Sequence, residues 1–187
     1  EASAAVADLR ALGARSVTMI TGDHGGAAAM VAERGGIDDI RADLMPEDKL
    51  TIVEELRAKY GCVAMVGDGV NDAPALAAAD VGIAIGAAGT DVAMETADVV
   101  LMGSDLQLLT DAVALSQASR RMIIHNLLIA LGVICVVAPL AVFGVAGLGP
   151  AVVLHEGSTV VVVLNALRLL RWKTGRRPAE SGTVPRL

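Results

Sequence analysis

The chain has 187 residues, of which 54% are hydrophobic and 2% aromatic, and its mean hydropathy of +0.60 is too high for an ordinary soluble domain. Its formal net charge of −6 is unevenly distributed, because acidic residues prevail in residues 1–118 and basic residues in residues 119–187. The acidic front half argues against nucleic acid as a partner.

Short β-branched segments alternate with alanine-rich segments in the front half, a pattern that predicts βαβ units around a parallel sheet. The chain starts without Met and within a helix-like pattern, so we expect it to be a piece of a longer protein. The predicted strands are residues 16–20, 63–66, 81–85 and 98–101, and the predicted helices are residues 26–34, 46–60 and 105–118.

The back half predicts a membrane hairpin. Two apolar helices are expected at about residues 122–147 and 151–171, each long enough to cross a hydrocarbon core of about 30 Å. Basic clusters at both outer ends place those ends, residues 1–118 and a disordered basic tail at 173–187 on the cytoplasmic side of the cell membrane. Two buried helices of a soluble bundle would be the alternative interpretation.

The most specific motif is the octet Gly67-Asp68-Gly69-Val70-Asn71-Asp72-Ala73-Pro74, which directly follows a predicted strand. Ligands of parallel sheets bind beyond the carboxyl ends of strands. There, Asp68, Asn71 and Asp72 supply the hard oxygen ligands that suit Mg²⁺, and Gly67 and Gly69 let the backbone approach a phosphoryl group. The alternative is an ordinary turn in which Asp and Asn cap a helix.

Two other segments offer groups for the same phosphate. Thr21, Gly22 and Asp23 also lie between a strand and a helix, where a hydroxyl and backbone N–H groups can hold phosphate oxygens. Lys49 follows Pro46 near a helix start and can supply a positive charge. Taken singly, Thr21 or Asp23 would be expected to cap a helix and Lys49 to be a solvated surface residue.

The order of these motifs resembles the haloacid-dehalogenase-like phosphotransfer fold, and in particular the P-type ATPases. The octet carries the likeness, together with 80–86 (Asp-Val-Gly-Ile-Ala-Ile-Gly) and 89–95 (Gly-Thr-Asp-Val-Ala-Met-Glu). The resemblance implies an ATP-driven pump whose phosphorylation domain occupies residues 1–118 and whose membrane helices occupy residues 119–172. By this resemblance Thr21 and Gly22 would contact the phosphoryl group, with Asp23 in the same catalytic loop, and Lys49 would neutralise it. Asp68 would bind catalytic Mg²⁺ with support from Asn71 and Asp72.

One departure from the family is serious. Its aspartyl nucleophile lies in an Asp-Lys-Thr-Gly-Thr segment, which this sequence lacks. The nucleotide-binding and actuator domains are absent as well. We therefore expect this chain to be the C-terminal portion of a pump, inactive by itself, with ATP bound mainly by the missing part.

The second apolar segment contains His155, Glu156 and Thr159. Ionisable residues inside a membrane helix are costly, so function is the default interpretation. Imidazole, carboxylate and hydroxyl ligands suit divalent transition metals such as zinc or cobalt, and this segment resembles the cobalt/zinc group of heavy-metal P-type pumps. The alternative is a hydrated pair near the membrane surface.

The sequence is compatible with three classes of function: an ATP-driven exporter of divalent metal ions, a membrane-tethered phosphatase of the same fold, and a non-catalytic fragment. The expected partners are the lipid bilayer, the metal ion, the ATP phosphoryl group and the missing part of the pump. A mere anchor has no need of the His155–Glu156 pair, which favours the pump.

Overall fold

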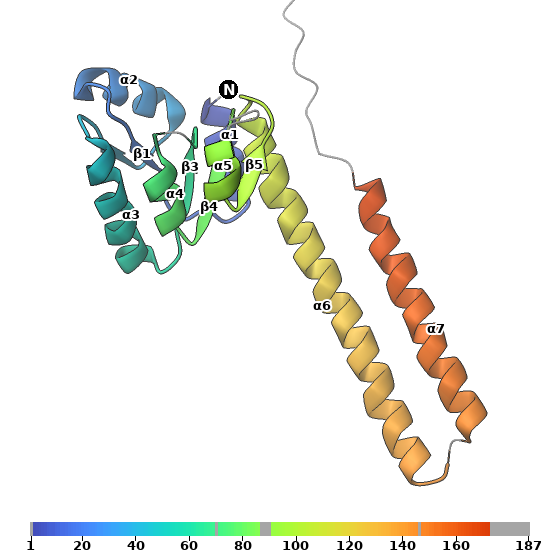
Figure 1. Cartoon of the computed structure of the whole chain (residues 1–187). Coiled ribbons are helices and arrows are strands. Elements are labelled where there is room, and N and C mark those ends of the chain that lie inside the picture. Colours follow the sequence, from blue (N-terminus) through green and yellow to red (C-terminus); the bar gives the residue numbers. More distant parts are fainter. Residues whose placement is uncertain (1, 70, 87–90, 146, 173–187) are drawn as a thin grey trace, which may run out of the picture. The chain divides into compact units, whose positions relative to one another are not determined.

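The computed structural model describes residues 2–69, 71–86, 91–145 and 147–172, which form two compact units joined within one helix, between Val113 and Ala114. The predicted tail at 173–187 and positions 89 and 90 of the family-like segment lie outside the described residues. Figure 1 shows the elements in chain order: α1 (Ala2–Ala11), β1 (Thr18–Ile20), α2 (Gly25–Gly35), β2 (Asp39–Arg41), α3 (Pro46–Tyr60), β3 (Ala64–Gly67), α4 (Ala73–Ala78), β4 (Val81–Ile85), α5 (Asp91–Thr96), β5 (Val99–Leu101), α6 (Gln107–Val142), α7 (Leu148–Leu167) and the 3₁₀ turn η1 (Arg168–Arg171).

All strand pairs in the described part of the chain are parallel, as the alternating pattern predicted. β1 pairs with β2, and β3, β4 and β5 form a second sheet in that order. Helices α4 and α5 cover one face of the three-stranded sheet (Figure 1). β1 and β3 are not hydrogen-bonded to each other, so each has one edge that no described strand pairs.

A small apolar core joins the elements that carry the predicted motifs. Val53 of α3, Met65 of β3 and Leu76 of α4 are buried against one another, together with Ala75. Ile20, the last residue of β1, packs against this cluster. Burial of these aliphatic groups is the main stabilising contribution here, and it brings the loops after β1 and β3 to the same part of the unit.

Two short elements of the first unit, β2 and α5, were not predicted from the sequence. β2 has only three residues, two of them charged, so it lacks the apolar alternation that marks a strand. Helix α5 has six residues and follows a stretch rich in glycine and alanine, which carries no periodic signal. Both elements depend on tertiary contacts rather than on local propensity.

A single helix, α6, replaces the two helices expected on either side of residue 118. Asp105 precedes its start, as predicted, and accepts a hydrogen bond from the backbone N–H of Gln107 at 2.9 Å. Arg120 and Arg121 lie inside this helix, where long basic side chains are good helix formers.

In the second unit, α6 and α7 are antiparallel (Figure 1). Segments Gln107–Val142 and Gly149–Arg171 are long and apolar enough to cross a membrane, and their most apolar windows are 0% buried within the structure. Many large aliphatic side chains on both helices are therefore exposed, among them Leu127, Leu131, Ile134, Val153, Val160 and Leu164. Exposed apolar surface of this extent indicates a surrounding of lipid or other helices.

Candidate active site

Lys49 and Asp72 form an ion pair at the loop that follows β3. The Lys49 ammonium lies 2.5 Å from Oδ1 of Asp72, and both side chains are largely buried, with 15% and 13% of their surfaces exposed. Pro46 begins α3 at its first position, which places Lys49 in the first turn. The two predicted residues thus meet, although 23 positions separate them in the chain.

Asp72 does not act as a simple helix cap. It precedes α4, but its side chain makes no capping hydrogen bond to that helix. Its carboxylate is directed instead to Lys49 and lies over Gly67, where a Cβ atom would be only 2.5 Å from Oδ2 of Asp72. The alternative interpretation of the octet as a capped turn therefore fails at this residue.

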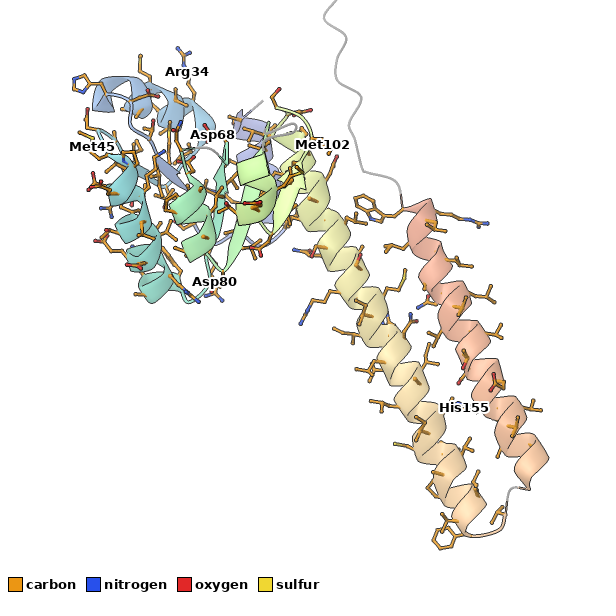
Figure 2. The ribbon with its side chains drawn as sticks, viewed as in Figure 1. Arg34, Met45, Asp68, Asp80, Met102 and His155 are labelled. Atoms are coloured by element: carbon orange, nitrogen blue, oxygen red, sulfur yellow. The ribbon has the colours of Figure 1, made fainter. Side chains whose placement is uncertain are left out.

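Asp68 lies at the carboxyl end of β3 (Figure 2) and is exposed. Its Oδ1 accepts a hydrogen bond from the backbone N–H of Asn71 at 3.2 Å, which holds the loop closed around the carboxylate. Gly69 has φ +80°, a left-handed conformation that glycine adopts without strain. The loop therefore presents one carboxylate outward at Asp68 and holds a second, at Asp72, against the backbone.

The loop after β1 is organised by Thr21. Its backbone N–H donates to Arg41 at 2.9 Å, and its hydroxyl oxygen accepts from the N–H of Asp23 at 3.1 Å. Gly22 lies close to the Leu44 carbonyl, 3.1 Å from where its Cβ would be. Helix α2 starts at Gly25 after His24 and has no side-chain cap, so neither Thr21 nor Asp23 serves as one.

Sequence reasoning missed the residue that fastens this loop. Asp43 accepts hydrogen bonds from Nδ1 of His24 at 2.8 Å and from the N–H of Gly25 at 3.2 Å, and its own N–H donates to Asp23. Its φ of +56° is unusual for a residue other than glycine. The hydrogen bond from His24 is the main reason why the pKa of Asp43 lies below its ordinary value. No sequence motif marks Asp43, beyond the tolerance of Asp for this backbone conformation.

The donor set at the β3 loop fits Mg²⁺ better than a transition metal. Within the described residues, no group of three or more His, Cys, Asp and Glu side chains is placed to hold a metal ion. Mg²⁺ typically uses one or two protein carboxylates and completes its shell with water and phosphate oxygens. Asp68 offers one exposed carboxylate of this kind at the end of β3, and the Asp72 carboxylate next to it is paired with Lys49.

In the part of the chain that the structure describes, the predicted hairpin residues are not gathered into a metal site. His155 (labelled in Figure 2), Glu156 and Thr159 are exposed on α7. The Thr159 hydroxyl donates to the His155 carbonyl at 3.3 Å, and the Ser158 hydroxyl donates to the same carbonyl at 2.7 Å. Helix α7 continues through Gly157, so the backbone carbonyls there stay within the helix.

The parallel sheets, the acidic loop and the Lys49–Asp72 pair together define a haloacid dehalogenase-like fold. The family model for haloacid dehalogenase-like hydrolases matches residues 1–80. The chain is 51% identical to "Probable cation-transporting ATPase G" of Mycobacterium tuberculosis (strain ATCC 25618 / H37Rv), over 99% of this chain and 24% of that protein. It is 46% identical to "Cadmium-transporting ATPase" of Staphylococcus aureus, over 88% of this chain and 23% of that protein.

A solved structure agrees with both sequence relatives. A zinc-transporting PIB-type ATPase in its E2.Pi state superposes on 90% of this chain and 27% of its own chain, with a TM-score of 0.80 and 44% identity. The chain is thus similar to one part of P-type ATPases that are named for the transport of metal cations. It spans about a quarter of the length of the curated relatives it matches.

Proposed function

We propose that this chain is the part of a metal-exporting P-type ATPase that combines Mg²⁺-dependent phosphoryl transfer with two membrane helices. ATP would be hydrolysed through an aspartyl phosphate whose acceptor residue belongs to another part of the same protein. The observation that carries this proposal is the largely buried Lys49–Asp72 pair, with Asp72 held against Gly67 at the end of β3.

The unpaired strand edges support an acceptor segment supplied from elsewhere in the protein. β1 and β3 each end in a predicted phosphate loop and share one apolar cluster through Ile20 and Met65, yet they do not pair. A further strand inserted between them would satisfy the backbone groups of both edges. An acceptor Asp at the end of that strand would then face Thr21 on one side and Asp68 on the other.

Each residue of the site has a distinct task in this proposal. The Thr21 hydroxyl and the Gly22 N–H bind oxygens of the transferring phosphoryl group. The Lys49 ammonium holds Asp72 in place and adds positive charge next to that group. Asp68 and Asp72 would hold Mg²⁺, which supplies the charge neutralisation on which phosphoryl transfer mainly depends.

The transported ion would be bound within the membrane by side chains of α7 and by helices outside this chain. His155 and Glu156 are ionisable residues on a helix of membrane-spanning length. Their nitrogen and oxygen donors suit a divalent ion of the zinc or cobalt type better than Cu⁺, which prefers thiolates. The names of the relatives include both cadmium and zinc, so they do not select one metal.

The test is ATP hydrolysis by the full-length protein in the presence of Zn²⁺, Cd²⁺, Co²⁺ and Mn²⁺ in turn. We expect at least one of these ions to stimulate turnover, and His155→Ala to abolish that stimulation. Ser158→Ala is the matched control, because Ser158 shares the His155 carbonyl but contributes no proposed ligand. Stimulation that survives in His155→Ala would place the transport site elsewhere.

A further inference from the structure

A groove of about 330 Å³ lies between the two helices of the second unit, near the end of the hairpin that is opposite its turn. Its lining includes Arg121 and His125 of α6, Arg168 of η1, and Trp172. No carboxylate is among the lining residues, so the groove is basic. None of these side chains has a role in phosphoryl transfer or in the proposed ion site.

Both arginines are oriented by neutral groups. Nε of Arg121 donates to the Gln117 carbonyl at 3.3 Å, and Nη1 of Arg168 donates to Oδ1 of Asn165 at 3.4 Å. Among the described residues, no ion pair joins either arginine to an acidic side chain. A guanidinium group has five N–H donors, so each arginine retains donors for an anion.

A second groove of about 480 Å³, lined by polar and aliphatic residues, overlaps the basic one. The two share His125, Asn165 and Arg168, and the second adds Leu128, Ile129 and Val161, which lie further toward the turn of the hairpin. The combined surface is therefore basic at one end and aliphatic along the membrane helices. A basic end followed by an aliphatic stretch matches an amphipathic ligand with an anionic head and a hydrocarbon tail.

We propose that this pair of grooves binds an anionic phospholipid. The headgroup phosphate would accept hydrogen bonds from Arg121 and Arg168, and an acyl chain would lie along Leu128, Ile129 and Val161. Basic pockets between membrane helices on the cytoplasmic side are suited to such headgroups, and Trp172 has the amphipathic character of residues at the membrane interface. The inference rests on the proposed membrane orientation of the hairpin, but not on the identity of the transported ion.

The test is native mass spectrometry of the full-length protein in detergent, titrated with phosphatidylglycerol or phosphatidylcholine of identical acyl chains. Three versions of the protein are compared: the unaltered protein, Arg121→Gln with Arg168→Gln, and Arg120→Gln with Arg171→Gln. The last pair loses the same charge at positions that do not line either groove. Titration with inorganic phosphate separates a lipid site from a soluble-anion site.

We expect the unaltered protein to prefer phosphatidylglycerol, and the Arg121/Arg168 variant to lose that preference by about fivefold per arginine. The Arg120/Arg171 variant should keep the preference within about twofold, since its charges lie outside the grooves. Arg121→Lys with Arg168→Lys should retain an intermediate preference, which guards against loss through misfolding. Equal loss in both glutamine variants, no loss in either, or displacement of the lipid by millimolar phosphate would overturn the proposal. Because lipid binding is read directly, the result is independent of metal-stimulated ATP hydrolysis.

Discussion

The Asp72 side chain occupies the space that any side chain at Gly67 would need. A Cβ atom on Gly67 would lie 2.5 Å from Oδ2 and 2.8 Å from Cβ of Asp72. Glycine at this position thus allows the Asp72 carboxylate to rest against the end of β3, where Lys49 reaches it. The glycine, the acid and the lysine form one structural unit contributed by two separate segments.

Gly67→Ala should therefore displace Asp72 and break its contact with Lys49. Overpacking of this kind costs about 1–3 kcal/mol, so we expect a lower melting temperature and reduced phosphoenzyme formation in the full-length protein. Gly26→Ala is the control, because nothing lies within 4 Å of the added Cβ and alanine favours the helix. Equal behaviour of the two variants would show that the close approach at Gly67 does not matter.

Asp43 should titrate below its ordinary value of 3.8 because His24 and the Gly25 N–H stabilise its charged form. Since the folded-state pKa is the lower one, this stabilisation is present above the unfolded-state pKa and is lost as the pH falls through the folded-state pKa. His24→Ala should raise the pKa of Asp43 toward its ordinary value. Carboxyl NMR titration of the folded protein measures this directly, and an unchanged pKa would show that His24 is not the cause.

Asn126 and Asn165 connect α6 and α7 through a hydrogen bond of 2.7 Å from Nδ2 of Asn165 to Oδ1 of Asn126. Interhelical hydrogen bonds of this kind contribute about 0.6 kcal/mol in membranes. We expect a double-mutant cycle with Asn126→Ala and Asn165→Ala to give a coupling energy of that size in detergent unfolding. Strictly additive effects would mean that the two amides do not interact in the membrane.

The octet allowed much of the site to be predicted from sequence, because its chemistry is local. Gly67, Asp68 and Asp72 lie within one loop, and a strand before it and Pro74 after it fix where that loop begins and ends. The helix starting at Pro46 was also predictable from local sequence, because proline is favoured in the first turn of a helix. A parallel α/β unit followed from the alternation of β-branched and alanine-rich segments, and the structure and the relatives confirm that fold class.

Other features depend on contacts between distant segments, which local patterns do not encode. The partnership of Lys49 with Asp72 requires the packing of Val53 against Met65 and Leu76. The hydrogen bonds that Asp43 makes with His24 and Gly25 require a left-handed backbone at Asp43, and no sequence motif around this residue predicts that conformation. The proposed roles of Thr21, Asp68 and His155 stay predictions, because they concern ligands rather than the fold.

Asp68→Asn in the full-length protein tests the central claim, that the β3 loop holds Mg²⁺ against the transferring phosphoryl group. The measurement is the level of acid-stable phosphoenzyme formed from radiolabelled ATP as Mg²⁺ is varied. We expect that level to fall by at least about a hundredfold, as is usual when a group that stabilises the transition state is removed. The control, Asp105→Asn, changes the same chemical group at a helix start where Asn caps equally well, and it should leave phosphorylation intact. Normal Mg²⁺-dependent phosphoenzyme in Asp68→Asn would contradict the account.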